Sequence, residues 1–181
     1  TGKVEYWDGF QWNMIKDEIA SFYNNVLYTG TGVQSHPITG VGFKPDLVWF
    51  KSIDDTYNHV LYDSLRGTDN ILNSNNSIAS ESNYNRFTSF DTDGFTLYGN
   101  NAGDLDKINR SSTDYVAWCF KAGGAPVPNS DGSITSQVSA NVAGGFSIVT
   151  YTGVGYPASS NAEVGHGLDS APELVIIKAT S

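Results

Sequence analysis

Acidic residues near the middle of the chain have a spacing that could bind a metal ion. The run DTDG (91–94) matches the opening of a calcium-binding loop. Such a loop also needs a third oxygen ligand and a distal Glu, whereas Phe95 and Thr96 follow here. Asp104 and Asp106, close to two asparagines at 100–101, could supply oxygens to a structural calcium as well. We interpret 91–94 as a hairpin turn and predict neither a metal site nor a cofactor.

The histidines could take part in acid–base chemistry, because a histidine beside a carboxylate can act as a general base. His36, His59 and His166 are these residues, and His59 is followed closely by Asp63 and Arg66. A catalytic base also needs a nucleophile and an orienting partner within reach. The sequence has no Gly-x-Ser-x-Gly elbow, no His-Glu-x-x-His motif and no isolated carboxylate pair framed by apolar residues. We therefore predict capping or solvated histidines, no catalytic residues and no enzyme activity.

A glycine-rich run and the single cysteine could also take part in chemistry, but each has a structural explanation. The run YTGTG (28–32) is rich in glycine, but a phosphate loop needs a following Lys-Ser or Lys-Thr and a helix. A turn at the end of a strand explains this run. The single cysteine, Cys119, lies in the apolar run YVAWCF, which predicts a buried and inert thiol and leaves no intrachain disulfide.

Aromatic residues in or beside polar loops form the candidate binding site. A ring with Asn and Asp neighbours suits a sugar, since the ring stacks on it while the neighbours bind its hydroxyl groups. The other reading of the same residues is core and rim packing in a sandwich. The candidates for carbohydrate binding are Trp7, Trp12, Tyr57, Tyr62, Tyr84 and Tyr98. Residues 70–85 form a long polar loop, which is either a recognition tip or a solvent-facing segment.

The overall charge and hydropathy exclude several classes of partner. The 181 residues carry a net charge of −9, which argues against nucleic acid, because phosphates are bound through Lys and Arg. No run approaches the ~20 apolar residues of a membrane span, and no basic-then-apolar signal peptide opens the chain. We expect no nucleic-acid partner, no membrane insertion and an acidic, solubilising surface.

The elements that must position these residues are β-strands. Short runs rich in Val, Ile, Tyr, Phe and Trp alternate with Gly, Asn, Asp and Pro, at the spacing of a sandwich and not of βαβ units. The expected strands lie in 46–52, 59–64, 86–99, 114–122, 133–140 and 145–153. The prediction is an all-β, antiparallel jelly roll, with a concanavalin-like sandwich as the close alternative. We expect its core to contain Leu47, Trp49, Val60, Phe95, Val116, Trp118, Phe120, Phe146 and Ile148.

An internal repeat divides the chain. Residues 28–51 and 151–178 both open with Tyr-Thr-Gly-x-Gly and both end in Pro, an acid, Leu-Val, two apolar residues and Lys. The openings lie 123 residues apart and the closing lysines, Lys51 and Lys178, lie 127 apart. This period is far longer than the roughly 20–50 residues of a solenoid repeat, so it indicates tandem domains.

The repeat gives the expected domain boundaries. Residues 1–15 are expected to be a hairpin module that turns at Asp8-Gly9 and ends an upstream unit. Residues 16–27 are expected to be a linker with a short helical turn within 16–25. Residues 28–143 would be a complete sandwich unit, and 144–181 the truncated start of a second, similar one. Both ends would then be cut inside β-structure.

Several of these runs resemble a family of virion proteins. The runs VWFKS, LYDSLRG, TSFDTDGFTL, YVAWCFKAGG, DGSITSQVSAN and GFSIVTYTG are similar to a repeat domain in structural proteins of tailed phages, especially marine and cyanobacterial ones. The run GKVEYWDGFQW is similar to a short hairpin repeat upstream in such tail fibres. The resemblance implies a structural or adhesive role in the extracellular particle and supplies no catalytic residues. One departure is that His166 has no counterpart in the first copy.

The expected function is therefore a phage tail-fibre or appendage segment that binds the host cell surface without catalysis. The expected partners are other virion proteins, a host surface glycan and two further copies in a homotrimer. Two alternatives stay open: a capsid-decorating or other structural virion fibre without receptor function, and a glycan depolymerase.

Overall fold

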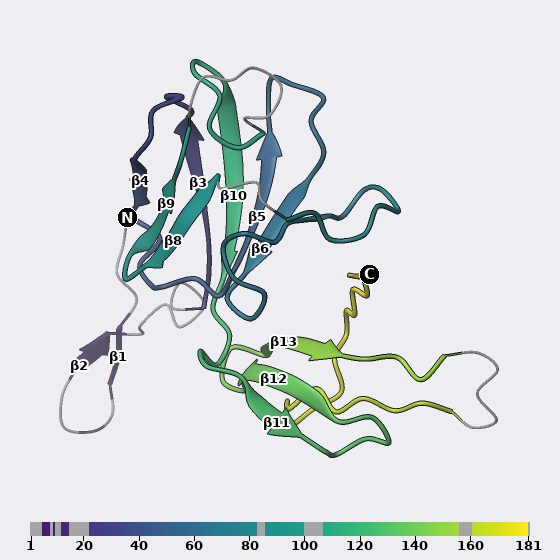
Figure 1. Ribbon diagram of the computed structural model, residues 1–181. Helices are drawn as coiled ribbons and strands as arrows, with labels where there is room; N and C mark the ends of the chain where they lie inside the picture. Colours follow the sequence, from purple (N-terminus) through teal and green to yellow (C-terminus); the bar gives the residue numbers. More distant parts are fainter. Residues whose placement is uncertain are drawn as a thin grey trace.

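The computed structural model describes residues 5–7, 9, 12–14, 22–82, 86–99, 107–155 and 161–180. Within these ranges every regular element is a β-strand, and all pairs of named strands are antiparallel (Figure 1). Two of the sheets pack face to face as a sandwich. The prediction of an all-β, antiparallel β-sandwich is confirmed.

One layer of the sandwich is a five-stranded sheet. Its strands in spatial order are β3 (Tyr23–Thr29), β10 (Asp114–Phe120), β5 (Leu47–Ser52), β6 (Val60–Asp63) and β7 (Leu72–Asn73). β10 pairs with all seven residues of β3 on one side and with all six of β5 on the other. Its sequence DYVAWCF suits a central strand, because aromatic and β-branched side chains pack well on a pleated surface.

The other layer has three strands: β4 (His36–Thr39), β9 (Gly94–Leu97) and β8 (Phe87–Asp91). Pro37 lies in β4, an edge strand, where a missing N–H is tolerated. Residues 91–94 form the hairpin turn between β8 and β9. Gly94 has a φ of +143°, and an added Cβ would lie 2.1 Å from the carbonyl oxygen of Ile38. The hairpin turn predicted at 91–94 is therefore confirmed, and its glycine lets β4 approach.

Aromatic rings from both layers interlock in the core. The Phe50 ring lies 5.2 Å from Phe95, edge to face, and Tyr62 stacks on Phe87 at 4.9 Å. Such offset and edge-to-face pairs add to the stabilisation that burial provides. The most completely buried large side chains are Tyr62, Tyr115, Phe50, Phe87, Phe95, Ile71, Leu97, Ile108, Val41, Val48 and Val60.

The expected core is right in part and wrong in two strands. Val60 and Phe95 are buried, as predicted. In β5 and β10 the other parity faces the core, namely Val48, Phe50, Tyr115, Ala117 and Cys119. Leu47, Trp49, Val116, Trp118 and Phe120 lie on the opposite, half-buried face of the sheet, while Phe146 and Ile148 belong to a separate sheet. Both faces of these strands are apolar, so alternation could not identify the inner one.

A second structured part follows the sandwich. The strands β11 (Val127–Asn129), β12 (Ser136–Asn141) and β13 (Phe146–Tyr151) form a three-stranded sheet below the sandwich in Figure 1. Residue 134 forms an isolated bridge with residue 164, so the segment around 163–167 lies against the β11–β12 hairpin.

The repeat also includes a hairpin, which precedes β3 in the first copy and β13 in the second. β1 (Glu5–Trp7) pairs with β2 (Trp12–Met14), and Tyr6 lies opposite Asn13. In the later hairpin Asn129 lies opposite Ser136, which is the same register 123 residues on. β13 likewise begins 123 residues after β3. The repeating unit therefore runs from a hairpin into a sandwich.

This repeat corrects the expected boundaries. The interval 16–27 is not a linker throughout, because residues 23–27 belong to β3 and Val26 packs against the core. Residues 16–21 lie outside the described residues. The expected unit 28–143 is also wrong at its end, since 127–141 pair with β13 and not with the sandwich. The described sandwich runs from β3 to Ala122, and the hairpin at 127–141 opens the second repeat instead of closing the first.

The repeated Tyr-Thr-Gly opening holds a loop from far along the chain. The Tyr28 hydroxyl donates to the carbonyl of Ile108 at 2.7 Å, and the Gly30 N–H donates to the carbonyl of Thr113 at 2.8 Å. A Cβ at Gly30 would lie 2.2 Å from the backbone oxygen of Arg110, whereas one at Gly153 would meet nothing within 4 Å. The opening is a docking point for residues 107–113 in the first copy, and it is open in the second.

The repeated acid before Leu-Val has a structural role in the first copy. The buried Asp46 carboxylate accepts hydrogen bonds from the Ala122 N–H at 2.9 Å and the Ser64 hydroxyl at 2.9 Å. Its own N–H donates to the carbonyl of Phe120 at 2.8 Å. Asp46 therefore ties together the ends of β5, β6 and β10.

The side chain of Trp118 lies on the outer face of β10 and not in the core, and this placement gives a stability prediction. Phe95→Ala should lower the free energy of unfolding by ~3–5 kcal/mol, as a large-to-small change in a closed core. Trp118→Ala should cost clearly less, because the indole is half-buried on the outer face. Denaturant midpoints of the two variants check this, and an equal loss in both would contradict the assignment of faces.

The two equivalent glycines give a matched pair. Gly30→Ala should destabilise the fold by ~1–3 kcal/mol, because the new methyl group meets the backbone of Arg110. Gly153→Ala should change stability by less than ~0.5 kcal/mol, since its site is open. Thermal or denaturant unfolding measures both, and a destabilising Gly153→Ala would show that this site is not open in solution.

Candidate functional site

The outer face of the five-stranded sheet is built by the alternation of its strands. One row across it contains, side by side, Asn25 of β3, Trp118 of β10, Trp49 of β5, Leu61 of β6 and Leu72 of β7. All of these side chains are half-buried or exposed. A sheet face that points away from the core is normally polar, so this apolar row is unusual for a surface.

Aromatic rings gather on this face. Trp49 and Trp118 lie 5.6 Å apart in a T-shaped arrangement, and His59 lies 5.9 Å from Trp49. Along the next row Phe120 lies 5.0 Å from Tyr23 and stacks on Phe146 of β13 at 5.1 Å. We call these rings the aromatic face; it consists of Tyr23, Trp49, Trp118, Phe120 and Phe146.

The aromatic face ends in an apolar pocket of about 380 Å³. Its lining consists of Phe22, Tyr23, Phe120, Ala143, Gly144, Gly145 and Phe146. The Lys121 N–H donates to the carbonyl of Phe22 at 2.8 Å, and the Asn141 amide donates to the carbonyl of Lys121 at 3.1 Å. The same Asn141 accepts the Gly144 N–H at 3.0 Å, so the turn that forms the wall is fixed to the sheet.

Two polar atoms on this face lack partners among the described residues. Trp49 Nε1 and His59 Nδ1 are both buried and make no hydrogen bond there. Buried polar atoms in native proteins are normally paired, so each such atom requires an explanation.

Three of the predicted carbohydrate-binding residues, Tyr57, Tyr62 and Tyr98, have described side chains, and these lie in different settings. The Tyr57 hydroxyl accepts a hydrogen bond from Arg110 at 3.1 Å, and Tyr98 is half-buried after β9. The prediction is wrong for Tyr62, which is 1% exposed and packs on Phe87 in the core. Its position in a short strand flanked by polar residues misled the interpretation. Burial raises its pKa well above the usual tyrosine value.

Three other candidates lie where their side chains are not described. Trp7 and Trp12 are opposite each other in the backbone register of β1 and β2, and Tyr84 lies outside the described residues. The residues that do form an aromatic surface were assigned to the core instead. Whether these residues are exposed depends on which face of the strand points to the core. The sequence does not indicate that face in β5 and β10, because both faces are apolar.

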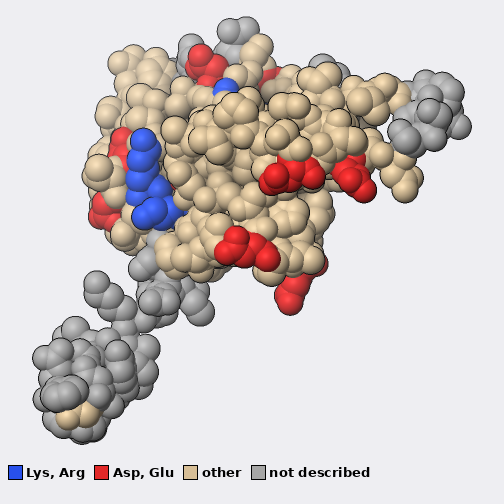
Figure 2. All heavy atoms as spheres, turned by 90° about the horizontal axis from the view of Figure 1, so that it is seen from below, with Lys and Arg blue, Asp and Glu red and all other residues tan. Residues whose placement is uncertain are grey.

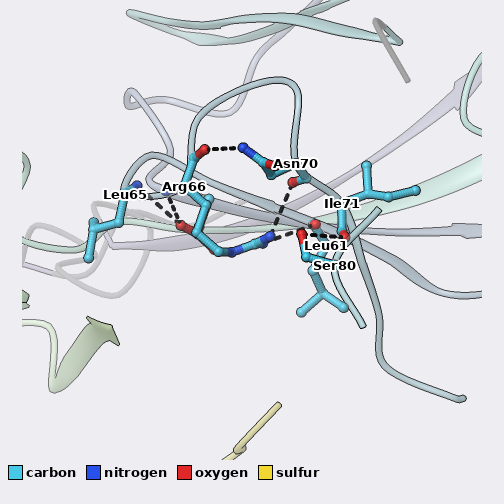
Figure 3. Close-up of polar contacts among 7 residues, drawn as sticks. Leu61, Leu65, Arg66, Asn70, Ile71 and Ser80 are labelled. Atoms are coloured by element: carbon cyan, nitrogen blue, oxygen red, sulfur yellow. Dashed lines mark hydrogen bonds and ion pairs between the residues drawn. The ribbon is translucent and has the colours of Figure 1, made fainter. Parts of the chain in front are cut away.

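Of the group His59, Asp63 and Arg66, the last two residues form a structural turn. Asp63 forms an ion pair with Arg66 at 2.6 Å and accepts the backbone N–H groups of residues 65 and 66. Figure 3 shows the guanidinium reaching the carbonyls of Asn70 and Leu61, at 3.1 and 3.3 Å. The charged groups of Asp63 and Arg66 therefore bind each other and the backbone of the turn. His59 lies against Trp49 instead.

The other two histidines also have local partners. His36 Nδ1 lies 2.9 Å from the buried Asn109 side chain, which also accepts the Thr31 N–H at 3.0 Å. His166 Nδ1 accepts the backbone N–H of Leu168 at 3.1 Å. The contact of His166 is of the capping kind that the sequence indicated, whereas His36 contacts a distant side chain.

The carboxylates of the 91–94 turn are used by the fold. Asp93 accepts the N–H groups of Gly42 and Gly40 at 2.6 and 3.1 Å, and these bonds lower the pKa of its carboxyl group. Asp91 accepts the hydroxyls of Ser89 and Thr96, both at 2.7 Å. No group of three or more His, Cys, Asp or Glu in the described part of the chain could hold a metal ion. Residues 100–106, the other calcium candidate, lie outside that part.

The thiol of Cys119 is buried in the core, as predicted. Burial raises the pKa of Cys119 to about 12, so the thiolate that would react is not formed near neutral pH.

The charged surface agrees with the acidic composition. Figure 2 shows acidic side chains as separate patches on a largely uncharged face, with most of the visible Lys and Arg in one stripe and a further small basic patch away from it. Across the described ranges there is no helix long and apolar enough to cross a membrane.

The environment of His59 generates a pH prediction. Burial lowers the pKa of His59, and the charge of Lys51 lowers it further. The folded state then binds this proton less readily than the unfolded chain, so stability should fall as the pH drops below ~6.5. His59→Gln should reduce the loss in denaturation midpoint between about pH 7.5 and about pH 5. His166→Gln is the control, and an equal acid response in both variants would contradict the prediction.

Comparison with known proteins gives one result. No curated protein and no solved structure matches the chain. Residues 18–181 match the model of a domain of unknown function, DUF7483. Because this match spans nearly the whole sequence, the chain belongs to the DUF7483 family of domains of unknown function.

Proposed function

We propose that this chain is a structural and adhesive segment of a phage virion fibre, which binds a host surface glycan on the aromatic face without catalysis. The observation that carries the proposal is the row of half-buried rings that leads into the pocket of about 380 Å³. The fibre context rests on the resemblance of the repeated motifs to phage structural proteins.

The chemistry of the aromatic face suits a saccharide. A sugar ring presents C–H groups that pack on aromatic faces and hydroxyl groups that need polar partners. Trp49, Trp118 and Phe120 supply the rings, and the exposed Asn25 lies directly opposite Trp118.

The carboxylates favour adhesion over hydrolysis. A glycosidase needs two carboxyl groups that face a common cleft, at roughly 5–9.5 Å from each other. Asp46, Asp63, Asp91 and Asp93 instead accept hydrogen bonds that shape turns and strand ends. A depolymerase is therefore the less favoured reading of this part of the chain.

Weak contacts become effective through repetition. A single shallow face binds a glycan with modest affinity, but tandem units and several copies of the chain raise the effective concentration. We propose a homotrimer within the extracellular particle, joined to other virion proteins. The mass of the chain by sedimentation at micromolar concentration tests the trimer, and a stable monomer would contradict it.

One observation supports the alternative of a purely structural fibre. Phe146 of the second repeat already stacks on Phe120 of the first, so part of the aromatic face joins consecutive units. In that reading the rings at Trp49 and Trp118 also pack against a neighbour and bind no receptor.

Glycan binding by variants separates these readings. Trp118→Ala and Trp49→Ala should each weaken binding on a glycan array by roughly tenfold, because each removes a stacking ring. Tyr57→Ala is the matched control, since its ring belongs to the earlier candidate set and not to the aromatic face. Retention of binding by both tryptophan variants, or release of cleaved saccharide, would overturn the proposal.

A further inference from the structure

The connection between the sandwich and the second repeat is short and contains adjacent glycines. Residues 121–126 lead from β10 directly to β11 and include Gly123 and Gly124 (Figure 1). A second pair, Gly144 and Gly145, lies in the turn between β12 and β13. Glycine-rich segments behave as flexible chains when nothing holds them. Both of these segments, however, are held by contacts.

One glycine of each pair is required by a close contact. A Cβ at Gly123 would lie 2.3 Å from the carbonyl oxygen of Ala140, and one at Gly144 would lie 2.9 Å from Cγ of Phe22. Neither glycine has a φ in the left-handed region, so the contact and not the backbone conformation excludes a side chain. The other glycine of each pair has a positive φ and open space around its Cβ position. The first glycine of each pair therefore lets two segments of the chain approach each other.

Lys121 is bound to both parts through its backbone. Its N–H donates to the carbonyl of Phe22 at 2.8 Å, and its own carbonyl accepts the side-chain amide of Asn141 at 3.1 Å. The oxygen of the same Asn141 side chain accepts the Gly144 N–H at 3.0 Å. One side chain of β12 therefore shapes the turn and attaches it to the end of the sandwich.

The residues that follow Lys121 are fixed as well. The Ala122 N–H donates to the buried carboxylate of Asp46 at 2.9 Å. The Ser139 hydroxyl of β12 donates to the carbonyl of Gly124 at 2.8 Å. The connection is therefore bound along its length, first to the sandwich and then to β12.

Aromatic rings add an apolar contact between the two parts. Phe120 of β10 stacks on Phe146 of β13 at 5.1 Å, and it also lies 5.0 Å from Tyr23 of β3. Such ring pairs add to the stabilisation that burial provides. The pocket of about 380 Å³ has walls from both parts, so its shape depends on how they are oriented.

We propose that these contacts form a rigid joint, which fixes the orientation of the second repeat relative to the first sandwich. The joint consists of Phe22, residues 120–124, Asn141, Gly144 and Phe146. Relative motion is the usual expectation for two parts that share a small interface. Here a rotation would break the bond from Asn141 to Lys121 and separate Gly144 from Phe22. The two parts therefore move as one body, and this inference does not depend on the adhesive function.

Spin labels on the whole chain test the proposal. Thr88→Cys in β8 and Gln137→Cys in β12 place one exposed label on each part, while the buried thiol of Cys119 stays unlabelled. Dilution with unlabelled chain removes distances between different copies. The distribution from double electron–electron resonance should be as narrow as that of Thr88→Cys with Asn25→Cys, a pair inside the sandwich. A distribution at least about twofold broader would overturn the proposal.

Two variants and a control act on the joint alone. Asn141→Asp still accepts the Gly144 N–H but cannot donate to the carbonyl of Lys121. Gly144→Ala places a methyl group against Phe22. Each variant should broaden the distance distribution by at least about twofold. Gly153→Ala, whose site is open, is the matched control and should leave the distribution unchanged. Unchanged distributions in both variants, or equal broadening in the control, would contradict the assignment of the joint.

Amide ¹⁵N relaxation gives an independent measure of the same motion. In the unaltered chain β10 and β12 should share one rotational correlation time, whereas in Asn141→Asp β12 should tumble faster than β10. Hydrogen exchange of β10 should be the same in both proteins, which shows that the variant loosens the joint without unfolding the sandwich. Separate correlation times in the unaltered chain would show that the joint is flexible and the proposal wrong.

Discussion

The sandwich depends on one strand, β10, which reaches back between two strands formed much earlier in the chain. Its inward side chains close the core, its outward side chains build the aromatic face, and the loop before it seats on the Tyr-Thr-Gly opening of β3. Asp46 then fixes the chain just after the strand by accepting the Ala122 N–H. Both edges of β10 and both of its faces are thus used.

The same strand contributes to the core and to the aromatic face, because its side chains alternate between the two faces of the sheet. Neighbouring residues such as Ala117 and Trp118 lie on opposite faces, so the core and the aromatic face are set by different positions of one segment. Changes on the outer row leave the interlocked Phe50, Phe87 and Phe95 cluster intact. The residues of the outer face can therefore vary on a constant core, because packing constrains only every second residue.

Sequence reasoning reached the fold class because strand composition and turn residues are local properties. The hairpin turn before Gly94, the internal repeat and the buried Cys119 were all readable in this way. Strand parity in β5 and β10 was not, because their residues are apolar on both faces and only tertiary packing distinguishes them. The placement of Tyr62 in the core and of Trp49 and Trp118 on the surface follows from that parity, and the unit boundaries required the register of two hairpins.

The hairpin that precedes β13 has a consequence for synthesis on the ribosome. β3 and its partner β10 are separated by more than eighty residues, so a nascent unit exposes an apolar strand long before its partner emerges. In the second repeat β13 is joined to β12 by a short turn and pairs with it over six residues. Such a local hairpin forms in microseconds, far faster than translation adds residues. In the second repeat the preceding hairpin thus covers one edge of β13 as soon as that strand is made, whereas the described pairing of β3 in the first repeat is with β10 alone.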